Sequence, residues 1–443
     1  MAKVTPLSGF PEWLPAERRV EQHVMDTFRE VAELHGFANI ETRAVEPMEQ
    51  LLRKGEIDKE VYVISRLHAD EGGEAKLGLH FDLTVPLARY VLEHQNDLAF
   101  PFRRYQIQKV WRGERPQDGR FREFYQADID IIGQDSLPAH MDADVAIVMA
   151  EVLGRLPLPG FRISVNNRRL SEAVFRALGL EDIDGVLRQL DKLAKIGADE
   201  VKKQLMGQVG ASSDQADGCL AFAAIRADHT NLAEKVAALG VGGDAIDSAV
   251  EDLAFVIDTV NSSVPNACIA DLSIARGLDY YTGTVFETFV EGHEDLGSIC
   301  SGGRYDQLAA DNRHTYPGVG LSIGLSRLVS RLVKENLVGA TRSVPTAVLV
   351  AVSSDEDRAA SVETARRLRA RGIATEVAPT AAKFGKQIKY ADRRGVPFVW
   401  FPTNESEGDV KDIRSGEQVG ARSGEWMPCD EDRYARVVQA TQD

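Results

Sequence analysis

The stretch VWRGERPQDGRFREFYQADIDIIG, residues 110–133, decides the expected fold. Residues 103–112 and 123–132 alternate polar and apolar side chains, which is typical of strands. Pro116 and Gly119 between them are turn residues. The pattern predicts a long antiparallel hairpin with an arginine-rich loop. The loop arginines, whose planar guanidinium groups can bind phosphate oxygens in pairs, are Arg112, Arg115, Arg120 and Arg122.

One face of the predicted hairpin is polar, because residues two apart in a strand share a face. The polar residues on this face are Gln126, Asp128 and Asp130 on one strand, and Gln106, Gln108 and Arg112 on the other. The ordinary interpretation is an antiparallel sheet whose polar side faces water. The short hydrogen-bonding side chains and the arginine loop instead favour a polyanion held above the sheet.

The composition is that of a globular protein, with 443 residues, 44% hydrophobic residues and a formal net charge of −16. This balance argues against non-specific nucleic-acid binding but permits specific binding through local patches. Residues 343–443 are nearly neutral, with 15 Lys/Arg and 16 Asp/Glu. No long apolar run or signal peptide is evident, so we expect no membrane span. The four cysteines form no zinc motif or disulfide framework, and we expect a reducing, cytoplasmic setting.

Periodicity predicts the other elements. Residues 17–36 repeat apolar side chains at helical spacing and end in Gly36, which predicts a helix. The further expected elements are a strand in 37–47, a helix from Pro86, a helix at 135–155, a mostly helical stretch at 170–260 broken at 207–218, and strands in 267–291. After a linker at 338–346, strands and helices alternate, which predicts a small α/β domain with a largely parallel sheet.

Three further segments carry candidate ligand-binding residues. ARGLDYYTGTVFE, residues 275–287, is strand-like, although adjacent tyrosines usually divide between core and surface. GSICSGGRYDQLAA, residues 297–310, is expected to form a strand, a Gly-Gly turn and a helix, and a plain tight turn is an equal alternative. Arg327 follows a glycine-rich strand early in a helix, where a lone arginine is more often solvated.

Together these segments resemble the histidyl-tRNA synthetase family of class II aminoacyl-tRNA synthetases. Residues 110–133 resemble the second class II motif, and GVGLSIGLSRLV resembles the third. ARGLDYYTGTVFE and SGGRYDQL resemble two signatures peculiar to this family, and HFDLTVPLARY resembles the segment that lines its amino-acid pocket. GEIDKEVY and KQIKYADRRGVPFVWF also agree with the family. Arg43 stands where many members have proline.

The resemblance implies an α+β catalytic domain on an antiparallel sheet with flanking helices (the class II synthetase type), a helical insertion and a C-terminal α/β anticodon-binding domain. The expected boundaries are 1–169 for the first part of the catalytic domain, 170–262 for the insertion, 263–336 for the second part, 337–345 for a linker and 346–443 for the anticodon-binding domain.

The implied activity has two steps. L-Histidine reacts with ATP to give histidyl-adenylate and pyrophosphate, and the histidyl group then passes to the 3′ end of tRNA(His), releasing AMP. ATP is a substrate, and Mg²⁺ is expected to bridge its phosphate oxygens with few protein ligands. We therefore predict no metal site made by the protein itself. A homodimer is implied by the resemblance alone.

The resemblance also implies the roles of single residues. Arg112 and Arg276 are expected to be catalytic at the α-phosphate, Arg327 to bind the γ-phosphate, and Arg120 to hold the outer phosphates and the tRNA end. Histidine is expected to be held by Asp82, Thr84 and Gln126 at its ammonium and carboxylate end, by Asp130 and Tyr281 at the imidazole, and with Tyr280 and Tyr305 nearby. The expected tRNA contacts in the last domain are Lys383, Lys386, Lys389, Arg393 and Arg394, for which a solvated helix face is the alternative.

Three other classes of protein stay open at this point. The first is a catalytically silent paralogue that senses histidine as a regulatory subunit; the intact Arg276 and the last domain oppose it. The second is a synthetase for another amino acid, which the two family-specific signatures oppose. The third is a plain nucleic-acid-binding protein, which would leave the polar face and the tyrosines unexplained.

Overall fold

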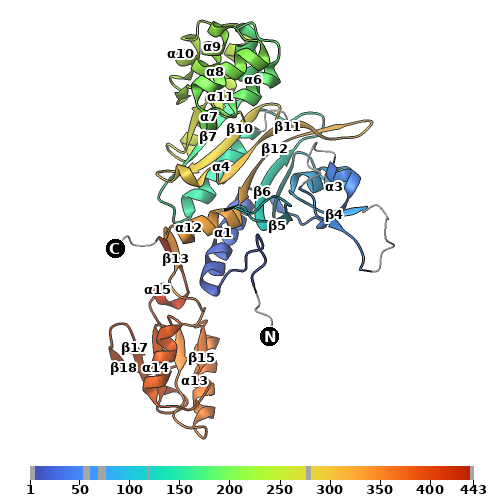
Figure 1. The fold of residues 1–443 in the computed structure, drawn as a ribbon. Helices are drawn as coiled ribbons and strands as arrows, with labels where there is room; N and C mark the ends of the chain where they lie inside the picture. Colours follow the sequence, from blue (N-terminus) through green and yellow to red (C-terminus); the bar gives the residue numbers. More distant parts are fainter. Residues whose placement is uncertain (1–4, 53–59, 68–75, 118, 276–280, 440–443) are drawn as a thin grey trace. The chain divides into compact units, whose positions relative to one another are not determined.

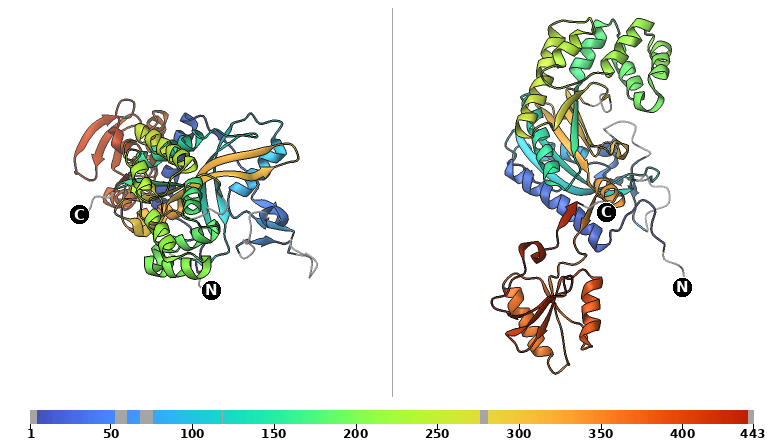
Figure 2. Two further views of the ribbon diagram at one scale, coloured as in Figure 1. Left: turned by 90° about the horizontal axis from the view of Figure 1, so that it is seen from above. Right: turned by 90° about the vertical axis from the view of Figure 1, so that its left-hand side faces the viewer.

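The computed structural model describes residues 5–52, 60–67, 76–117, 119–275 and 281–439. The chain divides into two compact units. The first is built from Met1–Pro11 and Val24–Arg331, and the second from Glu12–His23 and Leu332–Asp443. Figures 1 and 2 show the elements of each unit.

A large sheet, nine-stranded among the described residues, forms the floor of the first unit. Its order is β1-β5-β6-β12-β11-β10-β7-β9-β8, and neighbours are antiparallel except in the pairs β1–β5 and β7–β9. This confirms the expected fold class. The strands are β1 Ala38–Asn39, β5 Phe102–Trp111, β6 Glu123–Ile132, β7 Phe161–Asn167, β8 Arg226–Ala227, β9 Cys268–Asp271, β10 Thr284–Val290, β11 Cys300–Ala310 and β12 Thr315–Gly324.

The predicted hairpin is confirmed as β5 and β6, which pair along their whole length. Alternation placed the polar side chains on one face, and the register sets them opposite one another in three pairs. These pairs are Arg104 with Asp130, Gln106 with Asp128, and Gln108 with Gln126. β12 pairs with the other edge of β6, so that Gly320 lies opposite Asp130.

The predicted first helix is confirmed as α1, Pro15–Leu34. In the first unit, its fully buried Phe28 meets Tyr105 of β5 with ring centroids 6.4 Å apart. Gly36 has a φ of 76°, a left-handed conformation that suits the end of a helix. Two further helices pack against the sheet: α4, Met141–Arg155, on β12, and α11, Asp244–Ser263, on β7 and β9.

A small sheet and two helices lie beside the hairpin. The strand order of the small sheet is β2-β4-β3. Its strands are β2 Val45–Pro47, β4 Leu77–Leu79 and β3 Val63–Ile64. Helix α2, Met48–Leu51, follows β2, and α3, Thr84–His94, follows β4. The backbone of His80 accepts a hydrogen bond from Trp111 N–H at 3.0 Å, which joins this segment to β5.

Between β7 and β9 the chain is mostly helical, as predicted. The elements here are α5 Arg168–Ala177, α6 Ile183–Leu190, α7 Leu193–Ile196, α8 Ala198–Gln204, the π-helix η2 Leu205–Val209, α9 Ser213–Ala223, α10 Leu232–Ala237 and α11. The expected break at 207–218 is shorter than predicted. Ser212 and Gln215 form a capping box, so α9 already begins at Ser213.

The prediction of a Gly-Gly turn and a helix in 297–310 is wrong. β11 runs through Gly302 and Gly303, with an irregularity in its pairing with β12 between Tyr305 and Ala309. Gly303 lies opposite Gly320 of β12. The two glycines serve close approach between strands and not a change of chain direction. The expected strand and helix that follow are confirmed as β12 and α12, Leu325–Lys334.

The second unit contains the predicted α/β fold. Its five-stranded sheet, counted over the described residues, has the order β15-β14-β16-β17-β18, with β15, β14 and β16 parallel. The strands are β14 Val348–Val350, β15 Thr375–Val377, β16 Phe398–Pro402, β17 Glu407–Asp412 and β18 Gln418–Arg422. The helices are α13 Arg358–Ala370, α14 Phe384–Arg393 and α15 Asp430–Arg433.

The segment expected to be a linker contains a strand. β13, Val338–Ala340, pairs antiparallel with β19, Val437–Gln439, near the other end of this unit. The buried Arg342 donates hydrogen bonds to backbone carbonyls, among them that of Asp432 at 2.8 Å. Over the part of the chain that is described, no helix combines the length and the apolar character needed to cross a bilayer.

Candidate active site

A cavity of 270 Å³ is lined by the β5–β6 loop, β6, the start of β11 and the junction of β12 with α12. Four residues that the sequence analysis assigned to ligand binding line it: Arg112, Arg120, Gln126 and Arg327. Ser301 and Ser322 add hydroxyl groups to the same wall. The fold therefore brings side chains from the second and third motifs to one cavity.

Arg112 is held in place at the cavity wall. Its Nε donates to the backbone oxygen of Phe81 at 3.0 Å, and its Nη2 donates to Gln126 Oε1 at 3.3 Å. The guanidinium also lies 5.2 Å from the centroid of the Phe124 ring. These contacts orient the cation before any ligand arrives, which is what electrostatic stabilisation of a transition state requires.

Arg327 and Arg120 are restrained to different degrees. Arg327 Nη2 donates to the backbone oxygen of Leu296 at 2.9 Å. The side chain of Arg120 is 57% exposed and lies 3.9 Å from Glu114, a weak surface ion pair. Arg120 can therefore move towards a ligand, whereas Arg327 is already positioned.

Glu60 is a neighbour of this cavity that the sequence reasoning missed. Its backbone oxygen accepts a hydrogen bond from Gly113 N–H at 2.7 Å. Burial raises the pKa of the Glu60 carboxyl, the nearby Glu114 raises it further, and Arg112 opposes both effects. The signal available in the sequence was the family agreement of GEIDKEVY, in which Glu60 lies.

The polar face of the hairpin is buried, so the interpretation that it faces water is wrong. Gln106 is 0% exposed, Asp128 3% and Asp130 4%. Asp128 Oδ1 accepts from Ser322 Oγ at 2.5 Å, and Ser322 Oγ accepts from Gln126 Nε2 at 2.8 Å. Burying such groups is costly unless they are paired, and here they form a connected network, the polar floor.

Asp130 is the most constrained carboxylate of the polar floor. Its Oδ2 lies 2.6 Å from Arg104 Nη2, and its Oδ1 accepts from the Tyr305 hydroxyl at 2.5 Å. Gly320 and Gly318 of β12 make room for the contact between Asp130 and Tyr305. A Cβ at Gly320 would lie 2.0 Å from Asp130 Oδ1, and a Cβ at Gly318 would lie 2.4 Å from the Tyr305 ring.

Tyr281 lies in the same group of side chains. Desolvation raises the pKa of its hydroxyl, and the carboxylates of Asp130, Asp128 and Asp82 raise it further. This hydroxyl therefore stays protonated at neutral pH and can donate a hydrogen bond. Arg276 and Tyr280, which the sequence analysis also assigned to the site, lie outside the described residues.

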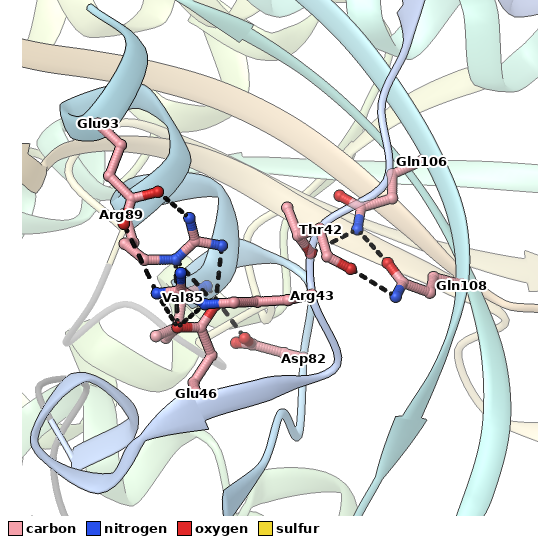
Figure 3. A network of polar contacts seen from close by, with 9 residues as sticks. All are labelled: Thr42, Arg43, Glu46, Asp82, Val85, Arg89, Glu93, Gln106 and Gln108. Carbon is pink, nitrogen blue, oxygen red and sulfur yellow. Dashed lines mark hydrogen bonds and ion pairs between the residues drawn. The ribbon is translucent and has the colours of Figure 1, made fainter. Parts of the chain in front are cut away.

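Asp82 and Thr84 are placed by the start of α3. Asp82 is buried, and its Oδ1 accepts from the backbone N–H of Val85 at 3.0 Å. Figure 3 shows the ion-pair network that anchors this helix, in which the fully buried Glu46 lies 2.8 Å from Arg89 and 3.1 Å from Arg43. Arg43 is thus an ion-pair partner of Glu46 on the β2 strand.

Two further residues of the polar floor were missed as site residues. Arg104 was not considered at all, and Asp128 was placed on the correct face without a role. Arg104 lies two residues before Gln106, so the same alternation would have placed it on the polar face. Its partners Asp130 and Gln106 lie on the hairpin itself, so the local pattern contained the signal.

In the second unit, the basic residues on α14 and at its two ends divide into two groups. Lys383, Lys386, Lys389 and Arg393 are exposed. Arg394 is instead held within the domain, with its Nη2 donating to Glu376 Oε1 at 2.7 Å and its guanidinium 5.0 Å from the Tyr390 ring centroid. The exposed group is therefore available to a ligand, whereas Arg394 stabilises the domain.

A mainly antiparallel sheet with arginines gathered over a buried polar floor, together with a separate α/β unit, is the architecture of a class II aminoacyl-tRNA synthetase. The family model described as histidyl-tRNA synthetase matches residues 9–328, and the anticodon binding domain model matches residues 346–420. The chain belongs to the histidyl-tRNA synthetase family.

Individual relatives are similar over nearly the whole length. A histidine–tRNA ligase of Micrococcus luteus is 57% identical, with 99% of this chain and 100% of that protein covered. A histidine–tRNA ligase of Cutibacterium acnes is 55% identical, with 99% of each covered. The crystal structure of histidyl-tRNA synthetase from Nostoc sp. PCC 7120 is 36% identical, has a TM-score of 0.85, and covers 96% of this chain and 98% of that one.

Proposed function

We propose that this chain is a histidine–tRNA ligase. It activates L-histidine with ATP, forming histidyl-adenylate and pyrophosphate, and then transfers the histidyl group to the 3′ end of tRNA(His), releasing AMP. The observation that carries the proposal is the meeting of Arg112, Arg120 and Arg327 at one cavity beside the polar floor. Family membership over both matched regions supports it.

In the first step, the histidine carboxylate attacks the α-phosphate, and negative charge builds on the phosphoryl oxygens. Arg112 binds the α-phosphate and the substrate carboxylate, and Arg276 acts on the α-phosphate. Arg327 binds the γ-phosphate, and the exposed side chain of Arg120 closes on the outer phosphates and the tRNA end. The chemistry needs little beyond positioning and charge stabilisation.

Histidine occupies the pocket above the polar floor. Its ammonium and carboxylate end binds Asp82, Thr84 and Gln126. Its imidazole offers a donor on one nitrogen and an acceptor on the other. Asp130 accepts from the donor, Tyr281 donates to the acceptor, and Tyr280 and Tyr305 complete the pocket. Buried polar groups of this kind reject analogues that cannot pair with them by about 10⁴–10⁵.

ATP is expected to carry Mg²⁺. Over the described residues, no group of three or more His, Cys, Asp and Glu side chains could hold a metal ion. We expect the ion to bind mainly to phosphate oxygens, where it offsets their charge. We further propose a homodimer, which rests on the family resemblance, and a cytoplasmic setting, which rests on the cysteine pattern.

The second unit is proposed to bind the anticodon region of tRNA(His). The exposed lysines of α14 and Arg393 supply charge next to the parallel part of its sheet. Single-stranded bases are read by stacking and by hydrogen bonds to their edges, so a nearly neutral domain suffices. We further propose that the remainder of the chain divides into two catalytic parts, at 1–169 and 263–336, and an insertion at 170–262.

Pyrophosphate exchange into ATP tests the proposal. The purified chain should exchange pyrophosphate when histidine is supplied and not with any other amino acid. Absence of exchange would favour a catalytically silent paralogue, and exchange with another amino acid would favour a different synthetase. Charging of tRNA(His) then tests the second step.

A further inference from the structure

Arg104 is an unusual residue for the middle of a central strand. Its side chain is 0% exposed, and its guanidinium lies 2.6 Å from Asp130 and 4.0 Å from Asp128. Its Nη1 donates to Gln106 Oε1 at 3.3 Å. A fully buried ion pair contributes little net stability compared with apolar side chains of the same size. A role in the chemistry of the polar floor would explain its presence.

Several charged or titratable groups face Arg104 and Asp130 from the surrounding elements. Asp128 on β6 and Tyr305 on β11 contact this pair, and Tyr281, which precedes β10, interacts with the carboxylates of Asp130, Asp128 and Asp82. Asp130 and Asp128 are therefore two buried carboxylates beside one buried arginine. Without a buried cation, Asp128 and Asp130 would repel each other, and one of them would tend to take up a proton.

We propose that Arg104 is a positioning residue that keeps Asp130 an ionised acceptor and thereby makes the pocket select the neutral imidazole of histidine. This inference rests on the proposed function. Arg104 already pairs with Asp130, so an imidazolium ring would bring a second cation to the same carboxylate. A neutral ring instead donates one N–H to Asp130 and accepts from the Tyr281 hydroxyl.

The geometry supports this division of roles. Both oxygens of Asp130 are oriented, one by Arg104 and one by the Tyr305 hydroxyl. A carboxylate oxygen has two lone pairs, so it can accept from the substrate as well as from its protein partner. Tyr281 keeps its proton because desolvation raises the pKa of its hydroxyl, and it therefore serves as a donor. The pocket thus offers one acceptor and one donor, which match the two nitrogens of the neutral ring.

The test is the KM for histidine in pyrophosphate exchange between pH 5.5 and pH 7.5. An imidazole with a pKa of about 6.5 is about nine-tenths neutral at pH 7.5 and about one-tenth neutral at pH 5.5. The wild type should therefore show a rise in KM of about tenfold towards pH 5.5. Arg104→Met should raise KM at pH 7.5 and show a rise of less than about threefold on acidification, because imidazolium then replaces the missing cation.

Matched variants separate this role from a general structural one. Arg104→Lys retains the charge and should restore the tenfold rise. Arg103→Met removes the adjacent arginine, whose side chain pairs with Asp144 at 2.6 Å on the opposite face of β5. It should keep the wild-type profile. If Arg104→Met does not fold, the double variant Arg104→Met/Asp128→Asn removes one charge of each sign and should still flatten the profile.

The inference would be overturned if KM for histidine still rose tenfold between pH 7.5 and pH 5.5 in a folded variant that lacks Arg104, either Arg104→Met or Arg104→Met/Asp128→Asn. The wild type in the same experiment distinguishes this outcome from failure of the proposed function. Wild-type exchange with parallel profiles in all variants would reject the role of Arg104 alone. Absence of histidine-dependent exchange in the wild type would reject the proposed function and the inference together.

Discussion

Replacing Gly320 by alanine should displace Asp130, the proposed imidazole acceptor. A Cβ at this position would lie 2.0 Å from Asp130 Oδ1 and 2.7 Å from the backbone oxygen of Ile129. Ordinary contacts begin at 3.4 Å, so the carboxylate would have to move by about 1.4 Å. The backbone oxygen cannot rotate away as a side chain can. Overpacking of this kind costs about 1–3 kcal/mol of stability.

The effect on histidine should exceed the effect on ATP. Misplacing a binding group by about 1 Å can lower a rate by ~10²-fold, so we expect kcat/KM for histidine in pyrophosphate exchange to fall about 100-fold. The KM for ATP should change little, because Arg112 and Arg327 are held by other contacts. A fall in kcat/KM for histidine and for ATP by the same factor, with both KM values unchanged, would show general unfolding.

Gly339→Ala is the matched control for this experiment. Gly339 also lies in a strand, β13, but a Cβ there would have no atom within 4 Å. This variant should keep the wild-type Tm and exchange rate. The reasoning would be refuted if Gly320→Ala, folded by circular dichroism, bound histidine as the wild type does.

Three other perturbations have expected outcomes. Arg112→Ala should slow pyrophosphate exchange by ~10²–10³. Arg120→Ala should slow it by less than about tenfold, because the Arg120 side chain is 57% exposed. Equal decreases for the two variants in stopped-flow or exchange assays would contradict the conclusion that Arg112 is held in place and Arg120 is not. A second variant replaces the exposed Lys383, Lys386 and Lys389 at α14 by alanine. The plot of log K for tRNA binding against log salt should become less steep by about 0.7–0.9 for each phosphate that the domain no longer neutralises. Histidine-dependent exchange should stay unchanged. Arg414 holds the pKa of Asp432 and of Asp412 below the ordinary value through hydrogen bonds. These contacts stabilise the folded domain by about 1 kcal/mol. The stabilisation is fully present above about pH 4 and disappears as pH falls through the lowered pKa values, so the Tm difference between wild type and Arg414→Met should shrink below pH 4. A constant Tm difference down to pH 2 would argue against this assignment.

The elements that were predicted correctly carry their signal within a short stretch of chain. The apolar repeat of 17–36 predicted α1, and Phe28 and Val31 on that repeat are fully buried. Strict alternation predicted β5 and β6 and the shared face of their polar side chains. Such patterns depend on the geometry of one helix or one strand pair, so one sequence suffices to interpret them.

The features that were missed depend on contacts between distant segments. Gly302 and Gly303 resemble a turn locally, but β12 makes them part of a strand by lying close against them. Likewise, the polar floor would face water if only β5 and β6 existed. Ser322 on β12 and Tyr305 on β11 turn it into a buried network. No local pattern in the hairpin predicts those partners.

The specificity of the pocket therefore depends on strand register as much as on the identity of the polar residues. Gly320 lies opposite Asp130 on one side and opposite Gly303 on the other. The absence of a side chain at Gly320 leaves room for the Asp130 carboxylate, Gly318 does the same for the Tyr305 ring, and Gly303 leaves room for the Tyr281 ring. A shift of β12 by one residue would set Val319 or Leu321 against Asp130 and would turn the floor's partners to the opposite face. Substitutions that loosen this register should for that reason impair histidine binding without touching any residue that contacts histidine.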